Sequence, residues 1–325
     1  MKYIDHESSQ GLILKEGPDP QPGPGQAIVR VEACGVNRAD LIQKQGAYPA
    51  PSGASHILGL ELAGRIERLP AQAPSAWKVG QAVMALVPGG AYATCACVDL
   101  ETMHPCPAHW SWSEAAAWPE ALYTCHLNLI DEGALQQGET VLVHAAAGGI
   151  GSMAVQMAKA AGAHVIATVG SAEKAQWVDG LGADTVIRYP EGFIKEQIRS
   201  AAPGGVDLVF DTVGGAGYAS LHPSIMKPYG RWVLIGLLGG RSATIDLGRM
   251  LQRNLRLIGS TLRSRPLWRK RRLAVDLESR WRALWERGNL EMRVDRIFPL
   301  AEAEAAHRYL AQNQNMGKVI LEMGT

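Results

Sequence analysis

Six short apolar segments, separated by helix-length stretches, occupy residues 117–261. In order they read VLVHA, VIATV, TVIRY, LVFDTV, WVLIG and LRLIGS. Apolar strands that alternate with helices of about a dozen residues are typical of a parallel sheet covered on both faces. Six such strands complete a doubly wound dinucleotide-binding domain. We therefore predict an α/β fold of this kind for residues 117–261.

The rest of the chain has a different pattern. Residues 1–116 are rich in Pro and Gly, and β-like runs such as AIVRVEACGV and LAGRIERL lie between turn residues. This pattern indicates a mostly antiparallel, barrel-like β domain. A helical segment near residues 267–287 precedes two further strand-like runs, VDRIFPL and GKVILEM. A complete six-stranded sheet has no place for them, so we predict that residues 262–325 complete the first domain.

Composition narrows the class of ligand. The chain has 325 residues, and its 32 basic and 31 acidic side chains give a net charge of +1. No global field therefore draws it to nucleic acid or to an anionic membrane, and we expect small-molecule ligands. Charged residues at the start, where a signal peptide needs an apolar core, predict a cytoplasmic protein. Five cysteines without CxxC spacing indicate reduced thiols rather than a disulfide framework.

A glycine-rich turn follows the first of the six strands. Ala145 stands where a dinucleotide loop usually has its first glycine, and Gly148, Gly149, Ile150 and Gly151 follow. An alanine is tolerable at that position if it keeps a negative φ. The turn lies between a strand and a helix of a βαβ unit, which is the context that the dinucleotide fingerprint requires. We predict a cofactor loop; a glycine turn that only allows tight packing is the alternative.

The second strand ends at Val169-Gly170-Ser171 without a carboxylate, and Lys174 follows. An acidic residue at this tip would bind the ribose hydroxyls of NAD. A neutral tip with a nearby cation suits the additional phosphate of NADP, which a carboxylate would repel. NADPH is therefore the predicted cofactor. Alternatively, Lys174 is a solvated helix residue.

Several longer motifs carry a family resemblance. They are GVNRADLIQKQGAYPAP, ILGLELAG, the glycine loop, GRWVLIGLLGG, LRLIGSTLRSR and AHRYLAQNQNMGKVILEM. Through them the chain resembles, over nearly its whole length, the zinc-independent medium-chain dehydrogenase/reductases of the quinone oxidoreductase (zeta-crystallin-like) class, and within it the tumour-suppressor-inducible branch. The resemblance implies a GroES-like β-rich catalytic domain, a doubly wound parallel-sheet Rossmann domain and NADPH as cofactor. It also implies a dimer or tetramer.

The same resemblance assigns site residues. The active-site asparagine and tyrosine of the class fall on Asn37 and Tyr48. Some relatives have a serine where this chain has Gly148, so any role of that hydroxyl is not transferred. The cofactor contacts fall on Thr124, Gly148, Gly149, Ile150, Gly151, Gly170, Ser171, Lys174, Tyr189, Gly236 and Leu237.

The metal ligands of zinc-containing relatives are not matched. Asn37 stands at the first ligand position, and the GHE element is Gly59-Leu60-Glu61. Leucine cannot bind a metal, and no run of four closely spaced cysteines exists for a structural zinc. We therefore predict no metal site. One competing cluster, for which buried thiols and loop residues are the simpler interpretation, comprises Cys95, Cys97, His104, Cys106 and His109.

Without zinc, no Lewis acid polarises a simple carbonyl, so alcohol dehydrogenation is disfavoured. A quinone or activated enone needs less help, and a hydrogen-bond donor near the acceptor oxygen suffices. We predict an NADPH-dependent quinone oxidoreductase in which Tyr48 and Asn37 are the donors. An enone reductase, or a cofactor-binding protein with little turnover, is the alternative function. Tyr48 could instead cap a proline turn, and Asn37 could satisfy loop backbone groups.

Three further expectations concern residues outside this set. We interpret Glu61 as a structural carboxylate and His144 as a packed core histidine. The sixth strand, residues 255–260, is predicted at the sheet edge, where it would form a homodimer. Acidic residues in the same helix favour a solvated helix face over a nucleic-acid interface for the basic cluster, which comprises Arg263, Arg265, Arg269, Lys270, Arg271 and Arg272.

Overall fold

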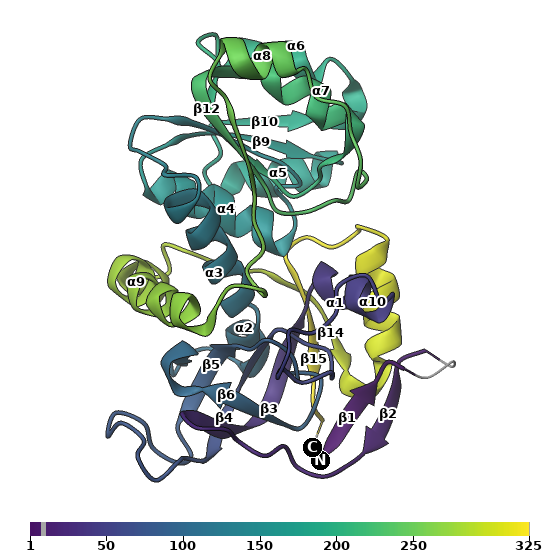
Figure 1. The fold of residues 1–325 in the computed structure, drawn as a ribbon, viewed down its shortest axis with the longest axis vertical. Coiled ribbons are helices and arrows are strands. Elements are labelled where there is room, and N and C mark those ends of the chain that lie inside the picture. The colour runs from purple at the N-terminus through teal and green to yellow at the C-terminus, as the bar shows by residue number, and fades with distance from the viewer. Residues whose placement is uncertain (8–10, 325) are drawn as a thin grey trace. The chain divides into compact units, whose positions relative to one another are not determined.

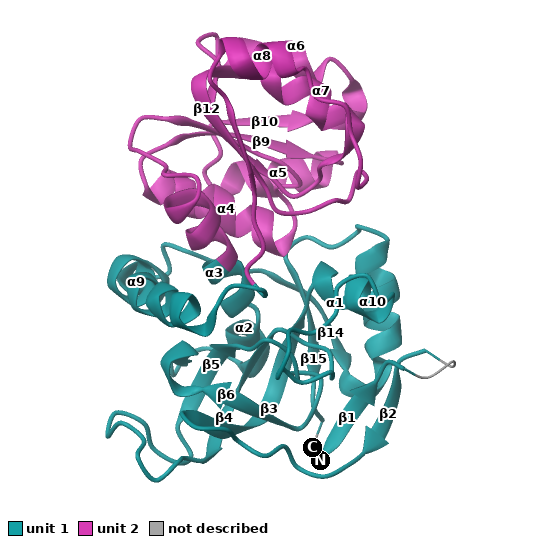
Figure 2. Ribbon diagram, viewed as in Figure 1, with its two compact units in different colours: residues 1–123, 263–325 teal, residues 124–262 magenta. Residues whose placement is uncertain are grey.

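The computed structural model describes residues 1–7 and 11–324. It divides into two compact units (Figure 2), one of residues 1–123 and 263–325 and the other of residues 124–262. The first boundary falls inside helix α3 (Pro119–His126), at residue 124 rather than at the predicted residue 117. The pattern of apolar strands could not locate it, because α3 precedes the first strand of the second unit.

The second unit contains one six-stranded sheet (Figure 1). Its strands are β8 (Thr140–Val143), β9 (His164–Val169), β10 (Thr185–Arg188), β11 (Val206–Asp211), β12 (Met226–Leu234) and β13 (Arg256–Gly259). Their spatial order is β10-β9-β8-β11-β12-β13, and every pair is parallel. The predicted doubly wound sheet is confirmed. The strand order reverses between β8 and β11, which makes the carboxyl end of β8 the switch point where such folds bind ligands.

The helices of this unit follow the strands along the chain. They are α4 (Gly149–Ala160), α5 (Ala172–Gly180), α6 (Ile194–Ala201), α7 (Gly215–Ile225) and α8 (Leu247–Gln252), with a π-helical turn at Leu127–Asp131. The strands are short and apolar because both sheet faces are covered; Leu142, Ile166 and Val209 lie in one buried cluster. Ser171 is the N-cap of helix α5, and its hydroxyl oxygen accepts a hydrogen bond from the Lys174 backbone N–H.

The first unit is built around a mostly antiparallel sheet. Its strands are β3 (Gln26–Val36), β4 (Glu61–Arg68), β5 (Ala82–Leu86), β6 (Cys95–Asp99), β7 (Met103–Pro105), β14 (Val294–Pro299) and β15 (Lys318–Glu322), and β1 (Lys2–Asp5) and β2 (Ile13–Glu16) form a separate hairpin. The path is β14-β15-β3-β4-β5-β7, with β6 on β3, and only β14 and β15 pair in parallel. Strand β15 pairs with β3, so the C-terminal residues complete this sheet.

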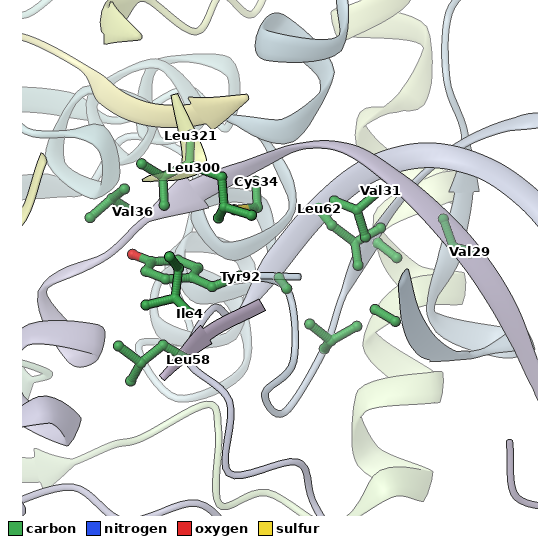
Figure 3. Packing of buried hydrophobic residues seen from close by; sticks show 14 of the residues in the cluster. Ile4, Val29, Val31, Cys34, Val36, Leu58, Leu62, Tyr92, Leu300 and Leu321 are labelled. Carbon is green, nitrogen blue, oxygen red and sulfur yellow. The ribbon is translucent and has the colours of Figure 1, made fainter. Parts of the chain in front are cut away.

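Helices α1 (Arg38–Lys44), α2 (Trp112–Ala116), α9 (Leu267–Glu286) and α10 (Ala303–Ala311) belong to the same unit. Its core joins distant segments: Figure 3 shows Ile4, Cys34, Tyr92 and Leu321 in one cluster. All five cysteines are free thiols, and burial raises the pKa of Cys34 well above its usual value. Among the described residues, no helix has both the length and the apolar character needed to cross a membrane.

Candidate active site

The glycine loop connects β8 to α4. The backbone N–H of Ala146 donates to the Thr168 carbonyl oxygen of β9 at 3.0 Å, and the Gly148 N–H donates to the Ala145 carbonyl oxygen at 3.1 Å. Ala145 has a φ of 50°, so the condition for a well-tolerated alanine at this position, a negative φ, is not met. The tight turn between strand end and helix start imposes this left-handed conformation, which strains a non-glycine residue.

Gly151 is required by the loop itself. A Cβ atom there would lie 2.7 Å from the Ala146 Cα and 3.0 Å from the Ala145 carbonyl carbon. At Gly148 the nearest atom would be the Ala145 carbonyl oxygen at 3.6 Å, an ordinary contact. Gly148 is the N-cap of α4 and supplies no side-chain cap, so this helix N-terminus lacks a capping side chain for its first N–H groups. These features fit the pyrophosphate of a dinucleotide, which would accept those hydrogen bonds.

Replacing Ala145 with glycine is expected to stabilise the protein by about 0.5–1 kcal/mol. Glycine removes the left-handed strain, and this gain exceeds its larger entropy loss on folding. The free energy of unfolding of the second unit, obtained by chemical denaturation, is the measurement. Ala146→Gly is the matched control: Ala146 is buried and has no positive φ, so it should lose stability. If both variants are destabilised, Ala145 is not strained.

The tip of the second strand brings four predicted residues together. Strands β9 and β10 pair in register up to Val169 and Arg188, so Gly170 and Tyr189 follow side by side. A Cβ atom at Gly170 would lie 2.7 Å from the Tyr189 hydroxyl oxygen. Ser171 caps α5, and half-buried Lys174 lies in the first turn of that helix. The tip therefore combines hydroxyl groups, a helix N-terminus and a lysine.

The remaining predicted cofactor residues lie at two further places in this unit. Gly236 follows β12, and a Cβ atom there would lie 2.9 Å from the Thr212 carbonyl carbon, so the two chain segments touch; the next residue, Leu237, is half exposed. Thr124 is buried at the end of α3, where the Cys125 thiol donates to the Ile150 carbonyl oxygen at 3.3 Å. Because all the strands are parallel, the segments that follow β8, β9, β10 and β12 share one sheet edge.

His144 lies directly before the loop and is fully buried. Its Nδ1 is 2.9 Å from the Thr168 hydroxyl oxygen, and its Nε2 is 2.9 Å from the His222 Nε2. Burial lowers the pKa of His144 to about 3, so the imidazole is neutral at physiological pH. The interpretation as a packed core histidine agrees with this geometry. His222, its partner from α7, was not found by sequence reasoning because nothing local marks the pairing.

In the first unit, Asn37 belongs to a buried cluster of polar side chains. Its Nδ2 donates to Glu61 Oε1 at 2.8 Å, and its Oδ1 accepts from the Lys318 ammonium at 2.7 Å. Lys318 also forms an ion pair with Glu61, and the Glu120 backbone N–H donates to the second Glu61 oxygen at 2.8 Å. Asn37, Glu61 and Lys318 are buried.

The loop backbone is satisfied by a different residue. Asp40 accepts from the N–H groups of Asn37 at 2.8 Å and Gly59 at 3.1 Å. Burial raises the pKa of Asp40 to about 6, although these two hydrogen bonds oppose the shift. The Asn37 amide group is therefore bonded to side chains, whereas Asp40 takes the backbone-satisfying role that was the alternative for Asn37.

The residues at the position where zinc-containing relatives bind their metal do not fit zinc. Leu60 is buried and has no donor atom, and the Asn37 amide oxygen is bonded to an ammonium cation. His104, from the competing cluster, is 2.6 Å from a Glu278 oxygen and 2.9 Å from the Tyr123 hydroxyl. Over the described ranges, no group of three His, Cys, Asp or Glu residues could hold a metal ion.

Tyr48 lies in the loop after α1 and is held by Arg263. The guanidinium carbon is 5.4 Å from the Tyr48 ring centroid, and the Nη1 donates to the Tyr48 carbonyl oxygen at 3.3 Å. Arg263 Nε also donates to the Pro88 carbonyl oxygen at 2.8 Å. Burial, with a contribution from nearby Glu120, raises the pKa of Tyr48 to about 12, whereas Arg263 opposes the shift. The phenol is thus protonated and able to donate.

Two members of the basic cluster are not on a solvated helix face, so that interpretation is wrong for them. Arg263 is 5% exposed and Lys270 8%, and the Lys270 ammonium donates to the Arg263 carbonyl oxygen at 2.6 Å. Arg272, in contrast, is exposed and pairs with Asp276. The helical periodicity of the sequence could have predicted the burial of Lys270. This residue shares the buried face of α9 with Leu273 and Leu277, three and seven residues later.

Comparisons with known proteins agree with this architecture. Residues 23–125 match the alcohol dehydrogenase GroES-like domain, and residues 149–277 match the zinc-binding dehydrogenase family. The chain is 30% identical to prostaglandin reductase-3 of Mus musculus, covering 96% of this chain and 85% of the relative. It is also 30% identical to quinone oxidoreductase-like protein 2 of Bos taurus, covering 98% and 90%.

A solved structure described as the quinone oxidoreductase of Thermus thermophilus and its complex with NADPH has a TM-score of 0.85 and 33% identity, and the match covers 99% of this chain and 100% of that one. The GroES-like β-rich domain and the Rossmann-like parallel sheet are thereby confirmed. The chain belongs to the medium-chain dehydrogenase/reductase superfamily of oxidoreductases and is similar to its quinone oxidoreductases and prostaglandin reductases.

Proposed function

We propose that this protein is a zinc-independent, NADPH-dependent quinone oxidoreductase. One observation carries the proposal: the Asn37 amide, at the first metal-ligand position of zinc relatives, is bonded to Lys318 and Glu61. A site that offers amide and phenol donors instead of metal ligands suits an acceptor whose own delocalisation stabilises the added charge. The similar Thermus structure, which is described as a complex with NADPH, supports the cofactor.

The residues have distinct tasks in this reaction. When bound, reduced nicotinamide would supply a hydride, and a proton from solvent would complete the two-electron reduction of a quinone to a hydroquinone. Tyr48 and Asn37 donate hydrogen bonds to the acceptor oxygen on which negative charge develops. The Arg263 guanidinium group packs on the face of the Tyr48 ring and holds this residue in place. The loop before α4 binds the pyrophosphate.

A substrate screen tests this function directly. NADPH oxidation is measured with quinones, activated enones and aldehydes, followed by product analysis. We expect turnover with quinones, little with aldehydes, and no effect of metal chelators. Turnover with enones alone would favour the enone reductase. If cofactor binds but no acceptor is reduced, the protein is a cofactor-binding protein rather than an enzyme of this kind.

Replacing Lys174 with alanine is expected to weaken NADPH binding by roughly 10 to 150 fold and to leave NADH binding almost unchanged. A charge-assisted hydrogen bond to the 2′-phosphate contributes about 1.5–3 kcal/mol, and about 1.4 kcal/mol corresponds to one decade. Ser171 and Tyr189 add neutral contacts. Titration of both cofactors at two salt concentrations is the measurement, because salt screens the phosphate contact more strongly.

The control for this experiment is Lys159→Ala. Lys159 forms an ion pair with Asp184 at 2.8 Å in the same unit, at the end of α4 away from its N-terminus. Replacing Lys159 with alanine should change neither the NADPH affinity nor the NADH affinity. Equal losses of NADPH and NADH binding in Lys174→Ala, or a wild type that prefers NADH, would contradict the assignment of the β9 tip.

We also propose a homodimer formed through β13. This strand is one of the two edge strands of the parallel sheet, and Leu257 on it is 40% exposed. Leu247 and Leu251 of α8, the helix before β13, are largely exposed as well. An apolar edge strand favours pairing with a second copy. Light scattering at micromolar concentration should give twice the chain mass. The Leu257→Lys variant should shift the measured mass toward that of a single chain. A monomeric wild type would contradict this assembly.

A further inference from the structure

The Asn37 amide has one acceptor atom and two N–H groups, and the cluster uses the acceptor and one N–H. The Oδ1 faces the Lys318 ammonium, and the Nδ2 faces a Glu61 carboxylate oxygen. Rotating the amide by half a turn would place NH2 against the ammonium and oxygen against the carboxylate. Both contacts would then be repulsive, so the charges of the two neighbours select a single orientation.

Three adjacent strands create this arrangement. Asn37 directly follows β3, Glu61 begins β4 and Lys318 begins β15, and β3 lies between β4 and β15 in the sheet. Glu61 also has its second oxygen fixed by the Glu120 N–H. Gly35 leaves room for it, because a Cβ atom there would lie 2.6 Å from the Glu61 Cδ. The carboxylate is therefore held from several sides and cannot follow a rotating amide.

A buried ion pair is weak evidence for stability, because the desolvation of two charges offsets their attraction. Glu61 is 0% and Lys318 4% exposed. Asp40, not this pair, satisfies the neighbouring loop backbone. The effect of the pair that stands out is therefore the fixed orientation of Asn37, whose second Nδ2 hydrogen has one defined direction.

We propose that Glu61 and Lys318 are positioning residues whose ion pair orients the Asn37 amide so that its remaining N–H donates to the oxygen of the acceptor substrate. This inference rests on the proposed function, in which Asn37 is a hydrogen-bond donor. An internal ammonium cation thus fixes a neutral donor at the position where zinc relatives bind their metal.

The test is the double variant Glu61→Gln, Lys318→Met. Because the Glu120 N–H still needs an acceptor, the glutamine would turn its NH2 toward Asn37, and methionine offers no charge, so the wild-type orientation of the Asn37 amide is no longer favoured. Replacing a buried ion pair by neutral groups of similar size is often neutral or stabilising, so the melting temperature should equal or exceed that of the wild type. The kcat for quinone reduction should nevertheless fall by roughly 10 to 100 fold, with KM and NADPH affinity little changed.

The single variant Lys318→Met should behave differently from the double variant in stability. Lys318→Met leaves an uncompensated buried carboxylate and should lower the melting temperature strongly, which separates fold stability from orientation. In NMR spectra, the Asn37 side-chain amide should give one sharp pair of signals in the wild type and shifted or exchange-broadened signals in the double variant. Unchanged kcat together with sharp signals at the wild-type positions in a folded double variant would overturn the proposal.

Asn37→Ala distinguishes this inference from the proposed function. If it leaves kcat unchanged, Asn37 is not a donor and the proposed site is wrong. If it lowers kcat and the double variant does not, Asn37 is a donor but the ion pair does not orient it. When orientation is the mechanism, adding Asn37→Ala to the double variant should cause no further loss, because the effects of coupled residues are not additive. Additive losses would contradict it.

Discussion

Replacing Gly151 with valine is expected to abolish binding of both NADPH and NADH. Any Cβ atom at this position meets the backbone of Ala145 and Ala146, and a branched side chain would drive the loop away from α4. The pyrophosphate would then lose both the close approach of the backbone and the helix N-terminus. Calorimetric titration with each cofactor is the measurement, and circular dichroism checks that the protein remains folded.

Gly148→Ser provides the matched control in the same loop. At this position a Cβ atom has an ordinary contact only, and the backbone φ of −80° suits any residue. Serine is a common N-cap residue, and its hydroxyl can rotate away from the α4 N–H groups when the pyrophosphate binds there. It should retain cofactor binding. Retained binding in Gly151→Val would show that the loop does not hold the cofactor.

Replacing Tyr48 with phenylalanine is expected to lower turnover with quinones by roughly 10 to 1000 fold, with NADPH affinity nearly unchanged. The ring would keep its packing against Arg263, so only the hydroxyl is lost. Within the described part of the chain, that hydroxyl has no hydrogen-bond partner, which leaves it available to a substrate. Steady-state kinetics with several quinones, and cofactor titration, are the measurements.

Tyr229→Phe serves as the control for this substitution. Tyr229 is 70% exposed on β12 in the other unit, so its hydroxyl should not affect turnover. If Tyr48→Phe also leaves turnover unchanged with every quinone, Tyr48 only lines the substrate pocket. A loss of NADPH affinity equal to the loss of turnover would instead place its role in cofactor binding.

The local periodicity of the sequence was sufficient to predict much of the fold. Alternating apolar strands and helices predicted the six-stranded parallel sheet, and the leftover segments after residue 262 predicted strands such as β15 beside the first-unit sheet. These patterns are predictive because the spacing of apolar residues within one strand or helix reflects which of its faces is buried. The glycine loop was recognisable for the same reason.

Backbone conformation was only partly predictable. The loop was placed correctly after β8, but the positive φ of Ala145 was not foreseen. The conformation of a single turn residue depends on how the helix must dock on the strand, and alanine by itself favours a negative φ. The helix packs closely on this turn, since a Cβ atom at Gly151 would lie 2.7 Å from the Ala146 Cα.

The partners of the proposed donors were decided by the tertiary structure. Asn37 lies 24 residues from Glu61 and 281 from Lys318, and Arg263 lies 215 residues from Tyr48. The family resemblance assigned Asn37 and Tyr48 as donors, whereas no sequence motif pointed to Lys318, and Arg263 was assigned to a solvated surface. The type and charge of each side chain are known from the sequence. Which charge faces it in a dry interior depends on strand pairing across the whole unit, and the energetic value of that contact arises only once water is excluded.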